Sequence, residues 1–205
     1  LLRGGKEARR SNKALATIIQ DACRVEGVPD GAVQFIESTD RTLVNEMLRM
    51  NGYIDLIIPR GRAELIRLVA ENATMAVVTG GIGVCHAYVD KTADVEKAAR
   101  IVDNAKVQRP TVCNALDCVL VHREIAGEFL PRLAKTWVAS GVEMRCDETA
   151  LQVVNNAGIA GAVPAQDSDW GMEFLSLVAS IKVVDSLDAA LEHIATYGSG
   201  HSEAI

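Results

Sequence analysis

The chain has 205 residues, enough for one large domain or two small ones, and its 49% hydrophobic content allows a sizeable buried core. The formal net charge of -6 argues against nucleic acid or an anionic membrane as the main partner, because both require a basic surface. No apolar run approaches the roughly 20 residues that span a bilayer, and no charged-then-apolar leader opens the chain, so we expect a cytoplasmic protein without membrane contact.

Short apolar strands alternate with amphipathic helices along the chain. The spacing of apolar residues predicts helices over 15–25, 41–50, a segment after Gly61, 93–105, 125–140 and 187–194. Strands are predicted over 32–36, 54–58, 75–78, 84–89, 118–122 and 177–184. The segment 149–169 is rich in Ala, Gly and Asn and follows neither period, so we expect an irregular connection there. This order is typical of an α/β fold with a largely parallel sheet.

The cysteines and histidines give little sign of a disulfide or a metal. The five cysteines are odd in number and lack CxxC spacing, which argues against a disulfide framework and a zinc ribbon. The four histidines are scattered singly, so no metal site is predicted. His86 and His201 stand beside small residues and are better site candidates than His122 and His193, but no Ser-His-Asp arrangement can be assembled.

Cys113 is the cysteine whose surroundings suggest chemistry. Pro110 fixes the chain before it, and the polar run NALD follows before the next strand begins, which places the thiol on a loop. A buried, small, apolar residue is the ordinary alternative for a cysteine, and the spacing alone leaves both interpretations open. Cys118 falls inside the following strand and is expected to belong to the core.

The first residues combine glycine with basic side chains. Gly4-Gly5 follows a strand end and opens a helix, a geometry that presents free backbone N–H groups to a phosphate, although the GxGxxG spacing is absent. Basic residues surround this turn, with Glu7 as the single acid: Arg3, Lys6, Arg9, Arg10 and Lys13. They are either a solvated helix face or, if a nucleotide binds, a receptor for a 2′-phosphate.

Several segments together resemble the γ-glutamyl phosphate reductases, a branch of the aldehyde dehydrogenase superfamily. In chain order they are LLRGGKEARRSN, IDLIIPRG, GIGVCHAYVD, VQRPTVCNALDCVLVH, GMEFLSLVASIKVVDSLDAALEHI and YGSGHSEAI, which cover nearly the whole chain. The resemblance implies an aldehyde dehydrogenase-like α/β fold. Residues 1–75 would be the C-terminal part of a Rossmann-type NADP-binding domain, and residues 76–205 the catalytic domain.

The resemblance also implies a reaction and its residues. Cys113 would attack γ-glutamyl phosphate to form a thioester, and NADPH would reduce the thioester to glutamate 5-semialdehyde, a step of proline biosynthesis. Cofactor contacts are implied for Arg3, Gly5, Glu7, Arg60, Gly61 and Glu173, and substrate contacts for Asn114, His201 and Ser202. For Glu173, a plain surface carboxylate is the alternative.

The sequence departs from the family pattern in three ways. The family usually shows a second glycine after IPRG, where this chain has Gly61-Arg62. Where the family shows ETLLVH after CNA, this chain has Asp117 followed by CVLVH. The family's N-terminal part, with its oxyanion-binding asparagine, and its C-terminal dimerisation tail are not in the chain, so we expect an internal fragment of a longer protein. The parent would be a homo-oligomer, with glutamate 5-kinase as a candidate partner. A catalytically incompetent structural module and a general aldehyde dehydrogenase remain as alternatives.

Overall fold

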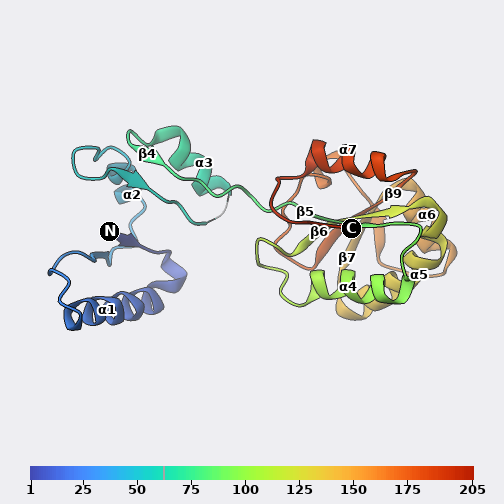
Figure 1. Cartoon of the computed structure of the whole chain (residues 1–205), viewed down its shortest axis with the longest axis horizontal. Coiled ribbons are helices and arrows are strands. Elements are labelled where there is room, and N and C mark those ends of the chain that lie inside the picture. Colours follow the sequence, from blue (N-terminus) through green and yellow to red (C-terminus); the bar gives the residue numbers. More distant parts are fainter. Residues whose placement is uncertain (62) are drawn as a thin grey trace. The chain divides into compact units, whose positions relative to one another are not determined.

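The structure is a computed structural model that describes residues 1–61 and 63–205. It divides into two compact units, Leu1–Thr79 (unit 1) and Gly80–Ile205 (unit 2) (Figure 1). Within the described residues, no helix is both long enough and apolar enough to cross a membrane.

Unit 1 contains two small parallel sheets joined by helices. Its strands are β1 (Leu2–Arg3) paired with β2 (Phe35–Ile36), and β3 (Leu56–Ile57) paired with β4 (Ala76–Val77). Its helices are a 3-10 turn (Lys6–Ala8), α1 (Arg9–Val25), α2 (Thr42–Met47) and α3 (Ala63–Asn72). The strands are shorter than the apolar runs that predict them, because only two residues of each form ladder pairs.

The apolar stripe of α1 does not pack as its spacing predicts. Leu15 is 58% exposed and Ile18 is 63% exposed, whereas the only buried residue of the helix is Ala16. The spacing therefore predicts the helix correctly, but the apolar face of that helix is exposed to solvent. Periodicity identifies an apolar face and says nothing about whether a packing surface is present.

Unit 2 is built on one six-stranded sheet in which every pairing is parallel. The strands lie in the order β10-β5-β6-β9-β7-β8. Their bounds are β5 (Cys85–Val89), β6 (Leu116–His122), β7 (Glu143–Cys146), β8 (Ala162–Pro164), β9 (Val178–Val184) and β10 (Glu203–Ala204). The predicted α/β class with a largely parallel sheet is confirmed.

Helices cover both faces of this sheet. Helices α4 (Val95–Val107), α5 (Arg123–Ser140) and α6 (Glu148–Asn156) pack on one face, and α7 (Leu187–Tyr197) packs on the other (Figure 1). The central strand β6 is buried along its whole length. Its side chains alternate between the two cores, with Val119 and Val121 facing α5 while Cys118 and Leu120 face α7. This two-sided burial explains why the run from Cys118 to Val121 is continuously apolar.

The irregular connection predicted over 149–169 is wrong. That segment contains most of α6, the strand β8 and a 3-10 turn at Asp167–Asp169, and the preceding strand β7 was not predicted. The Asp147 side chain accepts a hydrogen bond from the Ala150 N–H at 2.7 Å and begins α6, and Ala150 and Val154 are buried on one face. The short helix was missed because it ends in Asn155 and Asn156 and Gly158 comes soon after, which hides its period.

Candidate active site

Cys113 lies on the turn that connects α4 to β6. Two backbone hydrogen bonds shape this turn, from Val112 N–H to the Arg109 carbonyl and from Ala115 N–H to the Val112 carbonyl. The Cys113 residue is exposed, as the loop position predicted. Exposure of this thiol is the first requirement for a nucleophile that must reach a substrate.

The other four cysteines are less accessible. Cys85, Cys118 and Cys146 are buried and Cys23 is half-buried, and all five are free thiols. Burial raises the pKa of the Cys85 thiol to about 11, and it raises the pKa of Cys118 and of Cys146 to about 12. These three thiols therefore stay protonated at neutral pH and are poor nucleophiles.

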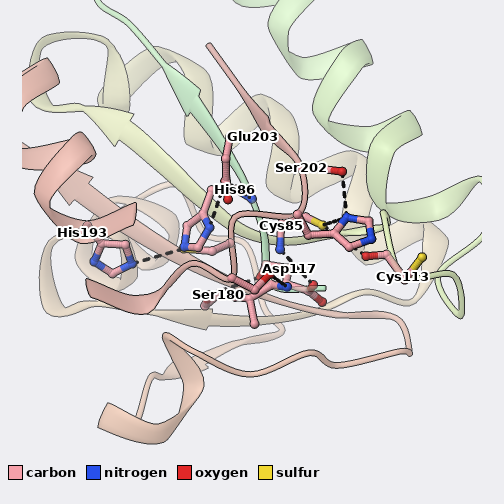
Figure 2. A network of polar contacts seen from close by, with 12 residues as sticks. Cys85, His86, Cys113, Asp117, Ser180, His193, Ser202 and Glu203 are labelled. Atoms are coloured by element: carbon pink, nitrogen blue, oxygen red, sulfur yellow. Dashed lines mark hydrogen bonds and ion pairs between the residues drawn. The ribbon is translucent and has the colours of Figure 1, made fainter. Parts of the chain in front are cut away.

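The start of β5 packs directly on the backbone of Cys113. The Cys85 thiol donates a hydrogen bond to the Cys113 carbonyl oxygen, with Sγ 3.3 Å from that oxygen (Figure 2). A Cβ atom built on Gly83 would lie 1.9 Å from the same oxygen. Residue 83 must therefore be glycine for the Cys113 turn to keep this position.

Glu173 is joined to the same segment. Its Oε1 accepts a hydrogen bond from the Gly83 N–H at 3.0 Å, which brings a half-buried carboxylate to the residue that packs on Cys113. The next residue, Phe174, donates its N–H to Asp117 Oδ1 at 3.1 Å. The structure therefore places Glu173 beside the Cys113 turn rather than on a remote surface.

His201 and Ser202 come from the segment that leads into β10. His201 Nδ1 lies 2.9 Å from Ser202 Oγ and 3.9 Å from Cys85 Sγ. Because Cys85 contacts the Cys113 carbonyl, the His201 ring lies near the Cys113 turn. Asn114 is exposed next to Cys113. Unit 2 thus gathers the predicted nucleophile, the predicted substrate residues and Glu173.

The remaining predicted residues, Arg3, Gly5, Glu7, Arg60 and Gly61, belong to unit 1. The Arg3 guanidinium donates a hydrogen bond from Nη2 to the Asp40 carbonyl at 2.7 Å. Gly5 precedes the 3-10 turn that contains Glu7, and Arg60 and Gly61 follow β3. The basic residues of this segment, Lys6, Arg9 and Arg10, are exposed.

A buried His-Cys cluster lies on the α7 side of the sheet. The ligand atoms of His86, Cys118 and His193 all lie within 4.8 Å of one another, and Cys118 Sγ is 3.7 Å from His193 Nε2. The Lys182 ammonium lies 3.3 Å from His193 Nδ1, so its positive charge opposes a metal cation at this ring. His86 is 2% exposed, which makes it a core residue rather than one that borders Cys113.

His193 should make the stability of unit 2 sensitive to mild acid. Burial, with smaller contributions from Lys182 and His86, lowers the pKa of His193 to about 4, against 6.5 for a free histidine. Between these values the unfolded chain binds the proton more strongly, so stability falls as the pH falls. From about pH 7.5 to about pH 5 the wild type should lose about 2 kcal/mol more than His193→Phe in urea unfolding. Equal losses in the two proteins would show that His193 is not held neutral.

Two charged residues near the site were not predicted to be part of it. Asp117 is 3% exposed inside β6, and Lys106 is fully buried on α4, with its Nζ 3.7 Å from Asp117 Oδ1. A single acid within the apolar run LDCVLVH was the signal available for Asp117. Lys106 gave none, since a lysine on an amphipathic helix is normally solvated.

The chain is similar to known proteins over all or most of its length. The model of the aldehyde dehydrogenase family matches residues 3–157. Curated proteins called gamma-glutamyl phosphate reductase match over the whole chain, at 55% identity in Dehalococcoides mccartyi and 54% in Roseiflexus castenholzii, with 48% and 49% of their lengths covered. The chain thus spans about half the length of the curated relatives that it matches.

A solved structure shows the same fold. The crystal structure of a gamma-glutamyl phosphate reductase from Thermotoga maritima superposes with a TM-score of 0.86 at 45% identity, covering 100% of this chain and 48% of that one. An acetylating aldehyde dehydrogenase from Geobacillus thermoglucosidasius, at 17% identity and a TM-score of 0.71 over 98% of this chain and 52% of that one, shares the fold. From the family match over residues 3–157, the chain belongs to the aldehyde dehydrogenase family.

Proposed function

We propose that this chain is the catalytic part of an NADPH-dependent reductase that converts γ-glutamyl phosphate into glutamate 5-semialdehyde and phosphate, a reaction of proline biosynthesis in the cytoplasm. The observation that carries the proposal is the exposed Cys113 thiol on a turn held by Gly83 and Cys85. Relatives called gamma-glutamyl phosphate reductase, 55% identical over 205 residues, support the choice of substrate.

The first step is an acyl transfer to sulfur. The Cys113 thiolate attacks the acyl carbon of γ-glutamyl phosphate, a C–S bond forms, and the C–O bond to phosphate breaks with its electron pair leaving on phosphate. The product on the protein is a γ-glutamyl thioester. No hydrolytic base is needed, because the thioester is removed by reduction. A reductive route is consistent with the sequence, which does not predict a Ser-His-Asp arrangement.

We assign the backbone N–H of Cys113 to the stabilisation of the oxyanion that develops during the attack. Such donors contribute most when they are held in place before the reaction, so that they need not reorganise. The Val112 carbonyl, which shares a peptide group with the Cys113 N–H, accepts a hydrogen bond from the Ala115 N–H at 3.0 Å. The contacts of Cys85 Sγ and Gly83 with the Cys113 carbonyl restrain the next peptide group. Asn114, His201 and Ser202 surround the turn and are proposed to bind the glutamyl portion of the substrate.

The residues fit a nicotinamide cofactor, which when bound supplies the hydride that reduces the thioester. Glu173 accepts the Gly83 N–H through Oε1, and its other carboxylate oxygen suits a ribose hydroxyl. Arg3, Gly5, Glu7, Arg60 and Gly61 of unit 1 would hold the adenosine and diphosphate portions. The exposed cations of this segment suit the 2′-phosphate of NADPH.

The reverse reaction tests the proposal. The complete gene product should reduce NADP⁺ with glutamate 5-semialdehyde only when inorganic phosphate is present, because phosphate must release the acyl group from Cys113. Oxidation of simple aldehydes with NAD⁺ that is independent of phosphate would instead identify a general aldehyde dehydrogenase. A chain that acts only as a structural module would show neither reaction.

A further inference from the structure

Asp117 accepts hydrogen bonds from two segments that are distant in the sequence. Its Oδ2 accepts from the Cys85 N–H at 3.4 Å (Figure 2). Its Oδ1 accepts from the Phe174 N–H at 3.1 Å. The side chain is 4% exposed, so water does not replace these bonds. One carboxylate therefore ties the first residue of β5 to the residue that follows Glu173.

Lys106 supplies the compensating charge. Its side chain is fully buried, Nζ lies 3.7 Å from Asp117 Oδ1, and it donates a hydrogen bond to the Leu116 carbonyl at 2.8 Å. The same ammonium lies 5.8 Å from the centre of the Phe174 ring. Lys106 therefore contacts β6 and the Phe174 segment at once, and it keeps Asp117 from being an isolated buried charge.

The two segments held by Asp117 also contact the Cys113 turn. Cys85, held by Asp117 through its N–H, contacts the Cys113 carbonyl through Sγ. Glu173, next to the held Phe174, binds the Gly83 N–H, and Gly83 packs on the same carbonyl. The Asp117 carboxylate thus binds both the segment that restrains Cys113 and the segment that carries Glu173.

We propose that Asp117, with Lys106 as its counter-ion, is a positioning residue that fixes the Cys113 turn relative to Glu173. The inference rests on the proposed function in so far as Cys113 is the nucleophile and Glu173 contacts the cofactor. A carboxylate is required because both oxygens accept. An asparagine offers one acceptor oxygen and turns an NH₂ group toward an N–H donor, so one of the two segments must be released.

The test compares three variants of the complete gene product. Asp117→Asn removes the double acceptor and leaves Lys106 without its counter-ion. The double variant Lys106→Met/Asp117→Asn also removes the stranded charge, so stability recovers while the second acceptor stays absent. Asp147→Asn is the matched control, because Asp147 also accepts two backbone N–H bonds, from Ala150 and Val183, but caps α6 away from Cys113.

These variants distinguish an effect on kcat, which reports positioning, from an effect on stability. Asp117→Asn and the double variant should both lose about 100-fold in kcat, with a smaller change in KM, since a displacement of about 1 Å has such an effect. Asp147→Asn should lower the unfolding midpoint and keep kcat within about twofold. Recovery of kcat together with stability in the double variant, or a kcat for Asp117→Asn within about threefold of wild type, would overturn the inference.

A second readout keeps the inference independent of the proposed reaction. The rate of iodoacetamide labelling of Cys113, followed by peptide mass spectrometry, needs neither substrate nor cofactor. It should change by about tenfold in both Asp117 variants and stay unchanged in Asp147→Asn. A wild type without phosphate-dependent turnover would refute the proposed function alone, whereas equal labelling rates in all variants would refute the positioning role.

Discussion

Replacing Cys113 by alanine is expected to lower phosphate-dependent turnover of glutamate 5-semialdehyde roughly 1,000-fold or more, because every step of the proposed reaction passes through a bond to its sulfur. The measurement is steady-state NADPH formation by the complete gene product. Folding should be intact, since residue 113 is exposed on a turn and its side chain does not fill the core. The loss should therefore appear in kcat without a change in the unfolding midpoint.

Cys23→Ala is the control for this experiment. Cys23 is a free, half-buried thiol of α1 in unit 1. Its removal should leave turnover within about twofold of wild type, because Cys23 is not among the proposed nucleophile, substrate or cofactor residues. Turnover by Cys113→Ala at a rate comparable to that of Cys23→Ala would place the nucleophile elsewhere.

Replacing Lys106 by methionine is expected to lower the free energy of unfolding by about 3–5 kcal/mol, because it strands the Asp117 carboxylate in the core. Burial lowers the pKa of Lys106 and raises the pKa of Asp117, so each charge is unfavourable without the other. Methionine keeps the volume of the lysine stem, which excludes a large cavity as the cause. Urea unfolding at neutral pH measures the change.

Lys97→Met provides the matched comparison for Lys106. Lys97 lies on the same helix, α4, but is exposed. An exposed substitution of this kind changes stability by about 0.5 kcal/mol or less. If the two methionine variants unfold at the same urea concentration, the Lys106–Asp117 pair is not a buried, mutually dependent pair.

Much of the fold could be predicted because its strands and helices are separately periodic. The run at β6 and the helix at α5 are long and apolar in the expected pattern, and both are found within two residues of their predicted starts. The short elements were not predicted, because they contain too few residues to show a period. Helix α6 has nine residues, ends in two asparagines and lies beside strands of three and four residues, too little sequence for either period to emerge.

The sequence indicated individual candidate site residues through local motifs and through the family resemblance, but not the contacts between them. Cys113 and Asn114 share one motif, and the resemblance pointed to Glu173, His201 and Ser202. The contacts that hold them could not be predicted, because Gly83, Asp117 and Phe174 meet only once the parallel strands are aligned. Burial of Lys106 depends in the same way on which side of α4 faces the sheet.

Trapping the acyl group on the protein is the most direct test that Cys113 is the nucleophile. In the absence of phosphate, oxidation of glutamate 5-semialdehyde by the complete gene product with NADP⁺ should stop at the acyl-enzyme. Peptide mass spectrometry should then find a γ-glutamyl thioester on the peptide that contains Cys113, and added phosphate should remove it. An adduct on a different cysteine, or turnover without any adduct and without a phosphate requirement, would contradict this account.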